Sequence, residues 1–425
     1  MLKKSIVISL VAMFVLSLSM MAIAADRVEL RLSWWGSESR HRNTLKAIEL
    51  YEELNPNIDI IPEYSGFEGY RNKLFSQIMA GNAPDVFTTV MEWYPDLASA
   101  DGMADLTGMI DVSGHNPKYV EASSYNGNMY GVNLSVNGLT MIQNNTILEK
   151  YGIEPLEAPY SWEDLADKFV EVYEKSNGEV YGASDPTVNT DGMGFDELKY
   201  YGYSKLGVDK PFPFDNDKFT ITKEEIQDFM QFFADLRERN AVAPVDISSM
   251  NDFSANNLMI QGIVAYEFSW AGTFGRYQDQ TTDELQPIPM PVGPNGEGGD
   301  LARPGLIFSV AKSSKNVEEA AKFIEWFTTS PEAAKILRNV RGVLPTTTQR
   351  AALLELPEEE LSNIDRKVMS VIDEILERKL KLAYAGPGGN GELGPIILPE
   401  IGQMIGFGQI SVEEGAERFM DSIND

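Results

Sequence analysis

The first folded part of the chain opens with a period-two pattern that gives way to a helical one. Residues Val28–Trp34 alternate apolar and polar side chains, which predicts a strand. From Asn43 onward the apolar positions recur at steps of three as far as Leu54, so we predict a helix that ends before Pro56. The segment between them, Trp35–His41, is predicted to be the loop at a strand end where open α/β sheets bind ligands.

The same rhythm continues beyond the first helix. Strands are predicted at Ile58–Tyr64 and Val86–Val90, with a helix at Tyr70–Met79 between them. A β-α-β-α-β order favours a parallel sheet with right-handed crossovers, which brings the loops after the strands to one edge. Each of these loops carries an aromatic residue: Trp35, Phe67 and Trp93.

Two adjacent tryptophans end the first strand. Neighbouring side chains of a strand point to opposite faces, so one core cannot easily absorb both Trp34 and Trp35. We expect one of them to line a site, and the alternative is that both are simply packed.

The rest of the chain predicts a second α/β unit. An extended run from Met129 through Gln143 is long for one strand and is interpreted as a crossing between two lobes. Further strands are predicted at Ile263–Phe268 and Leu306–Val310. A chain of 425 residues is long enough for two such lobes.

The N-terminus has the pattern of a secretory signal. Lys3 and Lys4 precede an uncharged run that ends in Ala22-Ile23-Ala24, so residues 1–24 are predicted to be removed. A membrane anchor is the competing interpretation, but it needs about 20 apolar residues, and the apolar centre Ile6–Leu18 is shorter. The sequence has no cysteine, which excludes disulfides and a lipid-modified cysteine. We therefore expect an exported protein without a lipid anchor.

The net charge of the chain limits the classes of partner that it is expected to bind. It has 35 Lys and Arg against 64 Asp and Glu, a net charge of −29, and loss of the two signal lysines makes this −31. Such an acidic protein is not expected to bind nucleic acid or anionic lipid.

Searches for catalytic, cofactor and metal motifs give little. Gly386–Gly391 matches G-x-G-x-x-G, but a helical pattern precedes it and Pro395 follows it, so no nucleotide site is predicted. His41 and His115 are the only histidines and lack metal-ligand spacing, so we expect neither a cofactor nor a zinc site. Asp215–Asp217 begins like a calcium loop, but Phe219 and Thr220 stand where an Asx residue and glycine belong, so no metal is predicted and a calcium ion stays open as an alternative. No catalytic residue stands out. A secreted polysaccharide lyase or glycoside hydrolase stays open as an alternative, because paired carboxylates among 64 acids cannot be recognised by spacing.

Several segments carry motifs that have to be considered together: Leu30–Leu54, Gly81–Val86, Asn257–Gly272, Ser309–Lys312, Ser330–Ala334 and Gly342–Thr347. In these residues and in this order the chain resembles the extracellular solute-binding proteins of bacterial sugar ABC transporters. In addition, Ser33–Gly36 with Arg40 and His41 is similar to the branch whose members take up pectin-derived oligogalacturonides and related oligosaccharides.

The resemblance implies a two-lobed periplasmic-binding-protein fold whose lobes close on a sugar without performing chemistry. Residues 26–133 and 308–344 would form the first lobe, and residues 134–307 and 345–425 the second. Hinge strands would lie at Val132–Val136, Ile307–Val310 and Gly342–Thr346. The implied partners are an oligosaccharide and the membrane permease of an ABC importer, with the protein itself a monomer.

Sugar sites combine aromatic rings with hydrogen-bonding groups. The expected stacking residues are Trp35, Phe67, Trp93 and Trp270. The expected polar residues are Ser37, Arg40, His41, Glu92, Asn133, Arg303 and Arg341, with Tyr384 beside the glycine-rich loop. For each arginine a surface ion pair is the alternative.

The charges at the start of the first helix bear on the ligand. Arg40, His41 and Arg42 lie there, where the helix dipole adds positive potential, and a guanidinium can grip a carboxylate with two hydrogen bonds. We therefore expect an acidic, pectin-derived oligosaccharide, with a neutral oligosaccharide as the alternative.

Overall fold

The structure is a computed structural model, and some segments lie outside its described part. It describes residues 27–189, 193–215, 218–251, 257–382 and 392–424. The expected signal peptide and Tyr384 lie outside these ranges. Within them, no helix is both long and apolar enough to cross a membrane.

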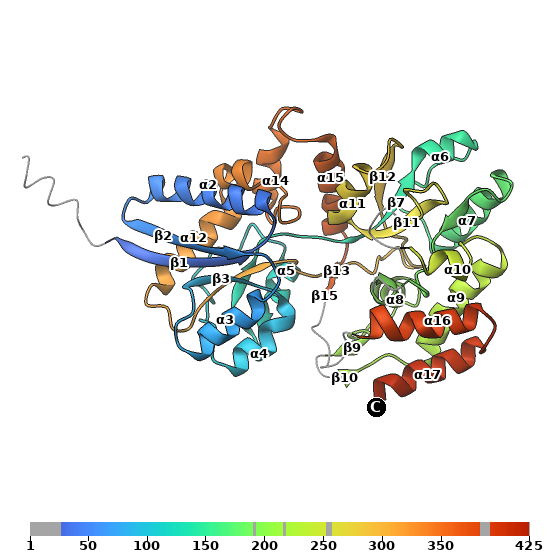
Figure 1. Ribbon diagram of the computed structural model, residues 1–425, viewed down its shortest axis with the longest axis horizontal. Coiled ribbons are helices and arrows are strands. Elements are labelled where there is room, and N and C mark those ends of the chain that lie inside the picture. The colour runs from blue at the N-terminus through green and yellow to red at the C-terminus, as the bar shows by residue number, and fades with distance from the viewer. Residues whose placement is uncertain (1–26, 190–192, 216–217, 252–256, 383–391, 425) are drawn as a thin grey trace, which may run out of the picture.

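Two sheets divide the chain into two lobes (Figure 1). The first sheet has the strand order β2-β1-β3-β14-β6, and the second has the order β12-β7-β11-β8. The first is built from β1 (Val28–Trp35), β2 (Ile58–Ser65), β3 (Val86–Thr89), β6 (Gly131–Asn133) and β14 (Ile307–Val310). The second is built from β7 (Leu139–Asn144), β8 (Tyr181–Ala183), β11 (Val264–Trp270) and β12 (Leu285–Pro289).

The direction of the strands in the first sheet follows the predicted rhythm. Strand β1 pairs in parallel with β2 and with β3, as the alternation of strands and helices predicted. Strand β14 runs antiparallel to β3 and to β6, because the chain returns to this sheet from the second lobe. The two-lobed α/β fold expected from the sequence is confirmed.

Helix α2 (Glu38–Leu54) starts earlier than predicted. The pattern placed its beginning near Asn43, and that prediction was wrong. Ser37 is the N-cap, and its side chain accepts a hydrogen bond from the backbone N–H of Arg40. The expected loop is therefore short, whereas α3 (Tyr70–Met79) has the predicted bounds.

The helices after the first sheet show where the chain changes lobes. Helices α12 (Val317–Thr329) and α13 (Pro331–Leu337) are followed by α14 (Thr347–Leu354), which packs against both. Helix α15 (Asn363–Glu377) instead contacts β12 and α11 (Phe274–Gln278) of the second lobe. Residues as far as Leu354 therefore pack with the first lobe, ten residues beyond the expected boundary at 344.

Smaller elements complete the lobes. In the first lobe these are α4 (Tyr94–Ser99), α5 (Pro117–Ala122), β4 (Ser124–Tyr125), β5 (Asn128–Met129) and the 3-10 helix η1 (Met91–Trp93). In the second they are α6 (Asn145–Lys150), α7 (Trp162–Lys175), α8 (Met193–Ser204), α9 (Lys223–Glu238), α10 (Val245–Ser248), the 3-10 helix η2 (Ala271–Thr273), η4 (Leu393–Ile397), α16 (Leu398–Gly406) and α17 (Val412–Asn424). Short strand pairs are β9 (Phe214–Asp215) with β10 (Lys218–Phe219), and β13 (Leu301–Ala302) with β15 (Lys381–Leu382).

Three segments run between the sheets side by side. The long extended run is interrupted: β6 ends in the first sheet and β7 begins in the second, so residues 134–138 cross between them. The N–H of Leu134 donates to the carbonyl of Leu306 at 2.8 Å, and the N–H of Val136 donates to that of Val343 at 2.8 Å. These backbone bonds join the three segments at the waist of the molecule (Figure 1).

Gly131 lies where β6 meets β14 with no room for a side chain. A Cβ atom there would sit 2.5 Å from the Ile307 side chain and 2.6 Å from the Phe308 carbonyl oxygen. We predict that Gly131→Ala lowers the free energy of unfolding by about 1–3 kcal/mol, as overpacking does, measured by urea denaturation. Gly66→Ala is the control, because a Cβ there meets nothing within 4 Å. Equal midpoints for both variants would contradict this account.

Candidate functional site

The aromatic residues that follow the first three strands gather at one edge of the first sheet. The ring centroid of Trp35 lies 5.7 Å from that of Phe67 and 5.5 Å from that of Trp93. Tyr70 joins them, with its ring 4.8 Å from Trp35. The prediction that these loops meet is confirmed. Tyr70 was not among the expected site residues, because as the first residue of a helix it carried no signal beyond its helical spacing.

The aromatic residues of this cluster differ in how far their side chains are exposed to solvent. Trp35 and Trp93 are only 7% and 9% exposed. Phe67 is 61% exposed, although it is a large apolar side chain. Phe67 is therefore the most exposed of the three expected residues, and its ring packs on the buried Trp35.

Trp270 is the corresponding aromatic residue of the second lobe. It ends β11, and the turn after it is held by Asn137 of the first crossing segment, whose side-chain oxygen accepts the N–H of Gly272 at 3.0 Å. The guanidinium carbon of Arg303 lies 5.6 Å from the centre of the Trp270 ring, in cation–π distance. Trp270 is partly buried and so keeps part of its surface open.

Arg303 connects the lobes through two carboxylates. It pairs with Glu92 of η1 in the first lobe at 3.2 Å and with Asp196 of α8 in the second at 3.6 Å. Lys199, one turn further along α8, also contacts Asp196, at 2.9 Å. These contacts bring Glu92, Trp270 and Arg303, three of the residues expected from the sequence, into one ion-pair network between the lobes.

The network keeps its members charged. Burial would raise the pKa of Asp196, but the charges of Lys199 and Arg303 outweigh burial and lower that pKa below its ordinary value. Burial would lower the pKa of Arg303, but Asp196 and Glu92 raise it above its ordinary value. Both partners are therefore ionised at neutral pH.

Asp196 was not among the site residues expected from the sequence. It lies in a helix, and the one visible signal is its i,i+3 spacing to Lys199. Such a spacing is common on solvated helix faces, so it does not identify a site.

His41 lies on the other face of β1. Its Nδ1 accepts a hydrogen bond from the indole N–H of Trp34 at 3.0 Å, and its ring lies 4.5 Å from that of Tyr64. Burial is the main cause that lowers the pKa of His41. The histidine is thus neutral and packs against Trp34 and Tyr64. The structure does not bring it to Trp35.

Arg40 and Ser37 shape the start of α2. Arg40 donates to the carbonyl of Trp35 at 3.1 Å and to that of Val340 at 3.4 Å. Its side chain lies over Gly36, where a Cβ atom would come within 2.3 Å of it. Ser37 serves as the helix cap. Both residues are therefore engaged in building the first turn.

Arg341 is buried rather than directed toward Arg303. Its guanidinium donates to the hydroxyl of Thr44 and lies 5.3 Å from the centre of the Phe327 ring. Burial, and then the nearby charge of Arg40, lower its pKa to about 9. Arg341 therefore packs between helices α2 and α12 of the first lobe.

Asn133 is buried at the end of β6. It is 1% exposed, and its side-chain oxygen lies 3.1 Å from Nδ1 of His115. In this arrangement it supports the crossing segments and does not face solvent. It is not brought to the aromatic cluster by any contact among the described residues.

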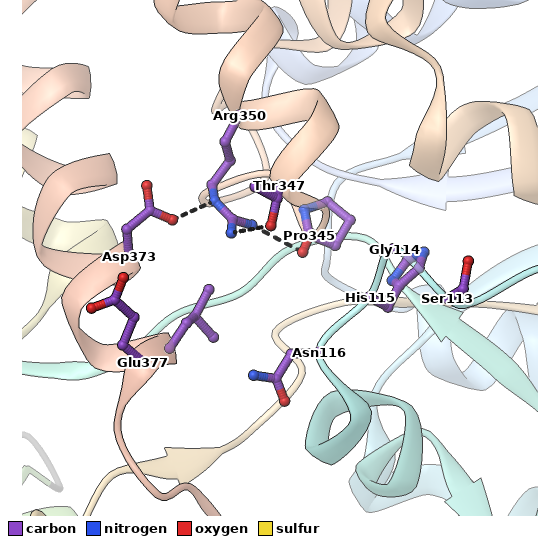
Figure 2. A pocket seen from close by; sticks show the side chains of 10 residues that line it. Ser113, Gly114, His115, Asn116, Pro345, Thr347, Arg350, Asp373 and Glu377 are labelled. Atoms are coloured by element: carbon purple, nitrogen blue, oxygen red, sulfur yellow. Dashed lines mark hydrogen bonds and ion pairs between the residues drawn. The ribbon is translucent and has the colours of Figure 1, made fainter.

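A pocket of about 490 Å³ lies beside the waist (Figure 2). The loop Ser113–Asn116 forms one wall, and Asp373 and Glu377 project from α15 on the other. Arg350 closes the top, paired with Asp373 at 2.8 Å and donating to the carbonyls of Leu344 and Pro345. The pocket shares no lining residue with the aromatic cluster. Among the residues that the structure describes, no group of three acidic or histidine side chains is arranged to hold a metal.

A buried network fixes the segment that carries Arg303. Asp300 is buried, and its carboxylate accepts from the Tyr200 hydroxyl at 3.4 Å and pairs with Arg378 at 3.5 Å. Arg378 also donates to the carbonyl of Met290 at 3.0 Å. Burial raises the pKa of Asp300 to about 6, and Arg378 opposes this only in part.

Comparison with known proteins gives the family. A family model described as bacterial extracellular solute-binding protein matches residues 37–334, more than half of the chain. The chain belongs to the bacterial extracellular solute-binding proteins. These proteins are periplasmic or secreted.

Individual solute-binding proteins show how far the likeness extends. A maltotriose-binding protein of Pyrococcus abyssi is 24% identical over 312 residues, which cover 71% of this chain and 62% of that protein. The chain thus spans less than two thirds of that relative.

Two solved structures show the same fold. An extracellular solute-binding protein family 1 from Alicyclobacillus acidocaldarius has a TM-score of 0.82 at 23% identity, covering 95% of this chain and 99% of its own. A periplasmic oligogalacturonide binding protein from Yersinia enterocolitica has a TM-score of 0.76 at 24% identity, covering 93% and 98%. At this identity the likeness shows the fold alone.

Asp300 is expected to make stability depend on pH. Its folded pKa of about 6 is above the ordinary 3.8, so the folded state binds this proton more tightly than the unfolded chain. The resulting stabilisation is fully present below the ordinary value and is lost as pH rises through about 6. We predict that the Tm of Asp300→Asn, relative to wild type, rises between about pH 4 and about pH 7.

Asp209→Asn is the matched control for this titration. Its side chain is 97% exposed, so its Tm difference from wild type should stay nearly constant. Differential scanning calorimetry across the pH range measures both variants. A constant difference for Asp300→Asn as well would contradict the role of burial.

Proposed function

We propose that the protein binds an oligosaccharide between its two lobes and delivers it to the permease of an ABC importer. The observation that supports this proposal is that the guanidinium of Arg303 contacts both Glu92 of the first lobe and the ring of Trp270 of the second. The site thus has aromatic and hydrogen-bonding groups on both sides. The proposal includes export by the signal at residues 1–24 and action as a monomer.

The chemistry of these residues suits a sugar. The C–H face of a pyranose packs on an aromatic ring, for which Phe67 and Trp270 have open surface. Adjacent hydroxyl groups can bond to a carboxylate or a guanidinium, which the network around Arg303 supplies.

Lobe closure is part of the proposal. The expected division gives the first lobe residues 26–133 and 308–344, and the packing of α14 favours extending it to Leu354. Hinges were expected at Val132–Val136, Ile307–Val310 and Gly342–Thr346, but Ile307–Val310 is strand β14 within the first sheet, and β6 extends to Asn133. The segments that join the sheets, 134–138, 303–306 and 342–346, would therefore absorb the change of backbone angles. A ligand drives closure only if it contacts both lobes, as one placed beside Arg303 would.

The enzymatic alternative has less support. A glycoside hydrolase needs a carboxyl group whose pKa is raised so that it can donate a proton. Near Trp270 the pKa of Asp196 is instead lowered, since Lys199 and Arg303 outweigh the effect of burial. We propose that the protein performs no chemistry. Incubation with pectin, xylan and starch oligomers tests this: a raised Tm at stoichiometric binding supports the carrier, and product formed with turnover supports a hydrolase or lyase.

The charge of the ligand is the finer part of the proposal. A pectin-derived acidic oligosaccharide was expected from Arg40, His41 and Arg42, and the name of the Yersinia neighbour is in line with it. The contacts of Arg40 and His41 weaken that expectation, since one binds backbone carbonyls and the other packs on Trp34. A neutral oligosaccharide needs neither residue.

Trp270 is predicted to be an energetic anchor for the ligand. Loss of such an aromatic residue costs roughly 2–4 kcal/mol of binding free energy, which corresponds to about 30- to 1000-fold in Kd. We predict this loss for Trp270→Ala, measured by titration calorimetry with the oligosaccharide that gives the largest rise in Tm.

Trp326→Ala is the control for that variant. Trp326 lies in α12, where it packs on Tyr51 with ring centroids 5.0 Å apart. Its loss should lower the Tm and leave Kd nearly unchanged. Wild-type affinity for Trp270→Ala would remove that residue from the site.

A further inference from the structure

We propose that Glu92 and Asp196 determine the charge of the ligand: by holding Arg303 between them, they make the site selective for an uncharged oligosaccharide and against one that bears carboxylates. The inference rests on the proposed function, because it concerns the same site. It assigns a specificity role to two acidic residues, one from each lobe.

The charges of this network are balanced. Arg303 and Lys199 supply two positive charges, and Glu92 and Asp196 supply two negative ones, joined by contacts of 2.9, 3.2 and 3.6 Å. A sugar carboxylate bound to the guanidinium of Arg303 would place a third negative charge beside Glu92 and Asp196, which already balance the two cations. A hydroxyl group adds no such charge, and it can donate to a carboxylate and accept from the guanidinium at once.

Arg303 is also fixed in place. Its guanidinium lies over Trp270, and that indole shares Asp196 as a hydrogen-bond partner. Turning Arg303 toward a ligand carboxylate would separate it from both Asp196 and the ring. The guanidinium is therefore preorganised for its present partners.

Other cations near the aromatic cluster have partners of their own. Arg71 lies 5.9 Å from the centre of the Trp93 ring and pairs with Asp96 at 2.6 Å. Arg40 is bound to the carbonyls of Trp35 and Val340. The charge of Arg71 is thus already balanced by an acid, and Arg40 is held by backbone carbonyls at the start of α2.

The surroundings add to the discrimination. The chain carries a net charge of −29, so an anionic sugar approaches against the field of the whole protein. Within the site, a carboxylate placed beside Glu92 or Asp196 without a cation of its own is repelled by these acids. The two acids come from different lobes, so both repel a ligand carboxylate only when the lobes are together.

The experiment compares matched ligands. One pair is trigalacturonate and its fully methyl-esterified form; the other is the neutral oligosaccharide with the largest Tm shift and the same sugar with one primary hydroxyl oxidised to a carboxylate. Titration calorimetry gives Kd for each at low and moderate salt. We expect wild type to bind the uncharged member of a pair at least about tenfold more tightly, with the ratio shrinking as salt screens the charges.

The variants are Glu92→Gln, Asp196→Asn and their combination. Freeing Arg303 should strengthen binding of the acidic member, so that the ratio of the two Kd values falls about tenfold or more in the double variant. Glu121→Gln is the control, since Glu121 pairs with Lys118 and has no contact with Arg303; its ratio should equal that of wild type. Thermal unfolding of each variant verifies that it is folded.

The results separate this inference from the proposed function. If wild type binds the acidic member as tightly as the uncharged one, or if the double variant keeps the wild-type ratio, the inference is overturned while sugar binding stands. If wild type binds no member of either pair and no oligomer in the screen, the proposed function fails, and the inference fails with it.

Discussion

The arrangement of the site depends on the interlobe ion pair of Arg303. Its guanidinium touches Glu92 from the first lobe and Asp196 from the second, and it covers the ring of Trp270. One side chain on a crossing segment therefore sets the position of groups from both sheets. Exposed ion pairs contribute little to stability, so this network matters for geometry more than for folding. It holds the aromatic residue and the acids of the site in one relative placement.

The segments that cross the waist of the molecule pack closely against one another. At Gly342 they leave no room for a side chain: its φ is 107°, and a Cβ there would lie 3.1 Å from Ser135. A left-handed backbone in such a space needs glycine. Leu134, Val136 and Leu306 of these segments are buried, so the waist is itself part of the packed core. In the proposed closure, movement of the lobes would make or break the contacts of Arg303.

Much of the fold could be predicted from hydrophobic periodicity, and much of the site could not. The bounds of α3 and the meeting of Trp35, Phe67 and Trp93 followed from strand and helix periods. The start of α2 was misplaced, because Ser37 caps it ahead of the apolar pattern. The sequence predicted His41 in one site with Trp35, but its ring accepts a hydrogen bond from Trp34, whose side chain points to the opposite face of β1. Asp196 became visible only through packing, because helical spacing does not reveal which long-range partner a carboxylate meets.

A crystal structure of the protein with a bound oligosaccharide tests the central claim most directly. The account predicts that the sugar lies between the lobes, with one ring against Phe67 or Trp270 and a hydroxyl group within hydrogen-bond distance of Glu92, Asp196 or Arg303. A sugar bound instead in the pocket between Asn116 and Asp373, with no contact to Arg303, would contradict it.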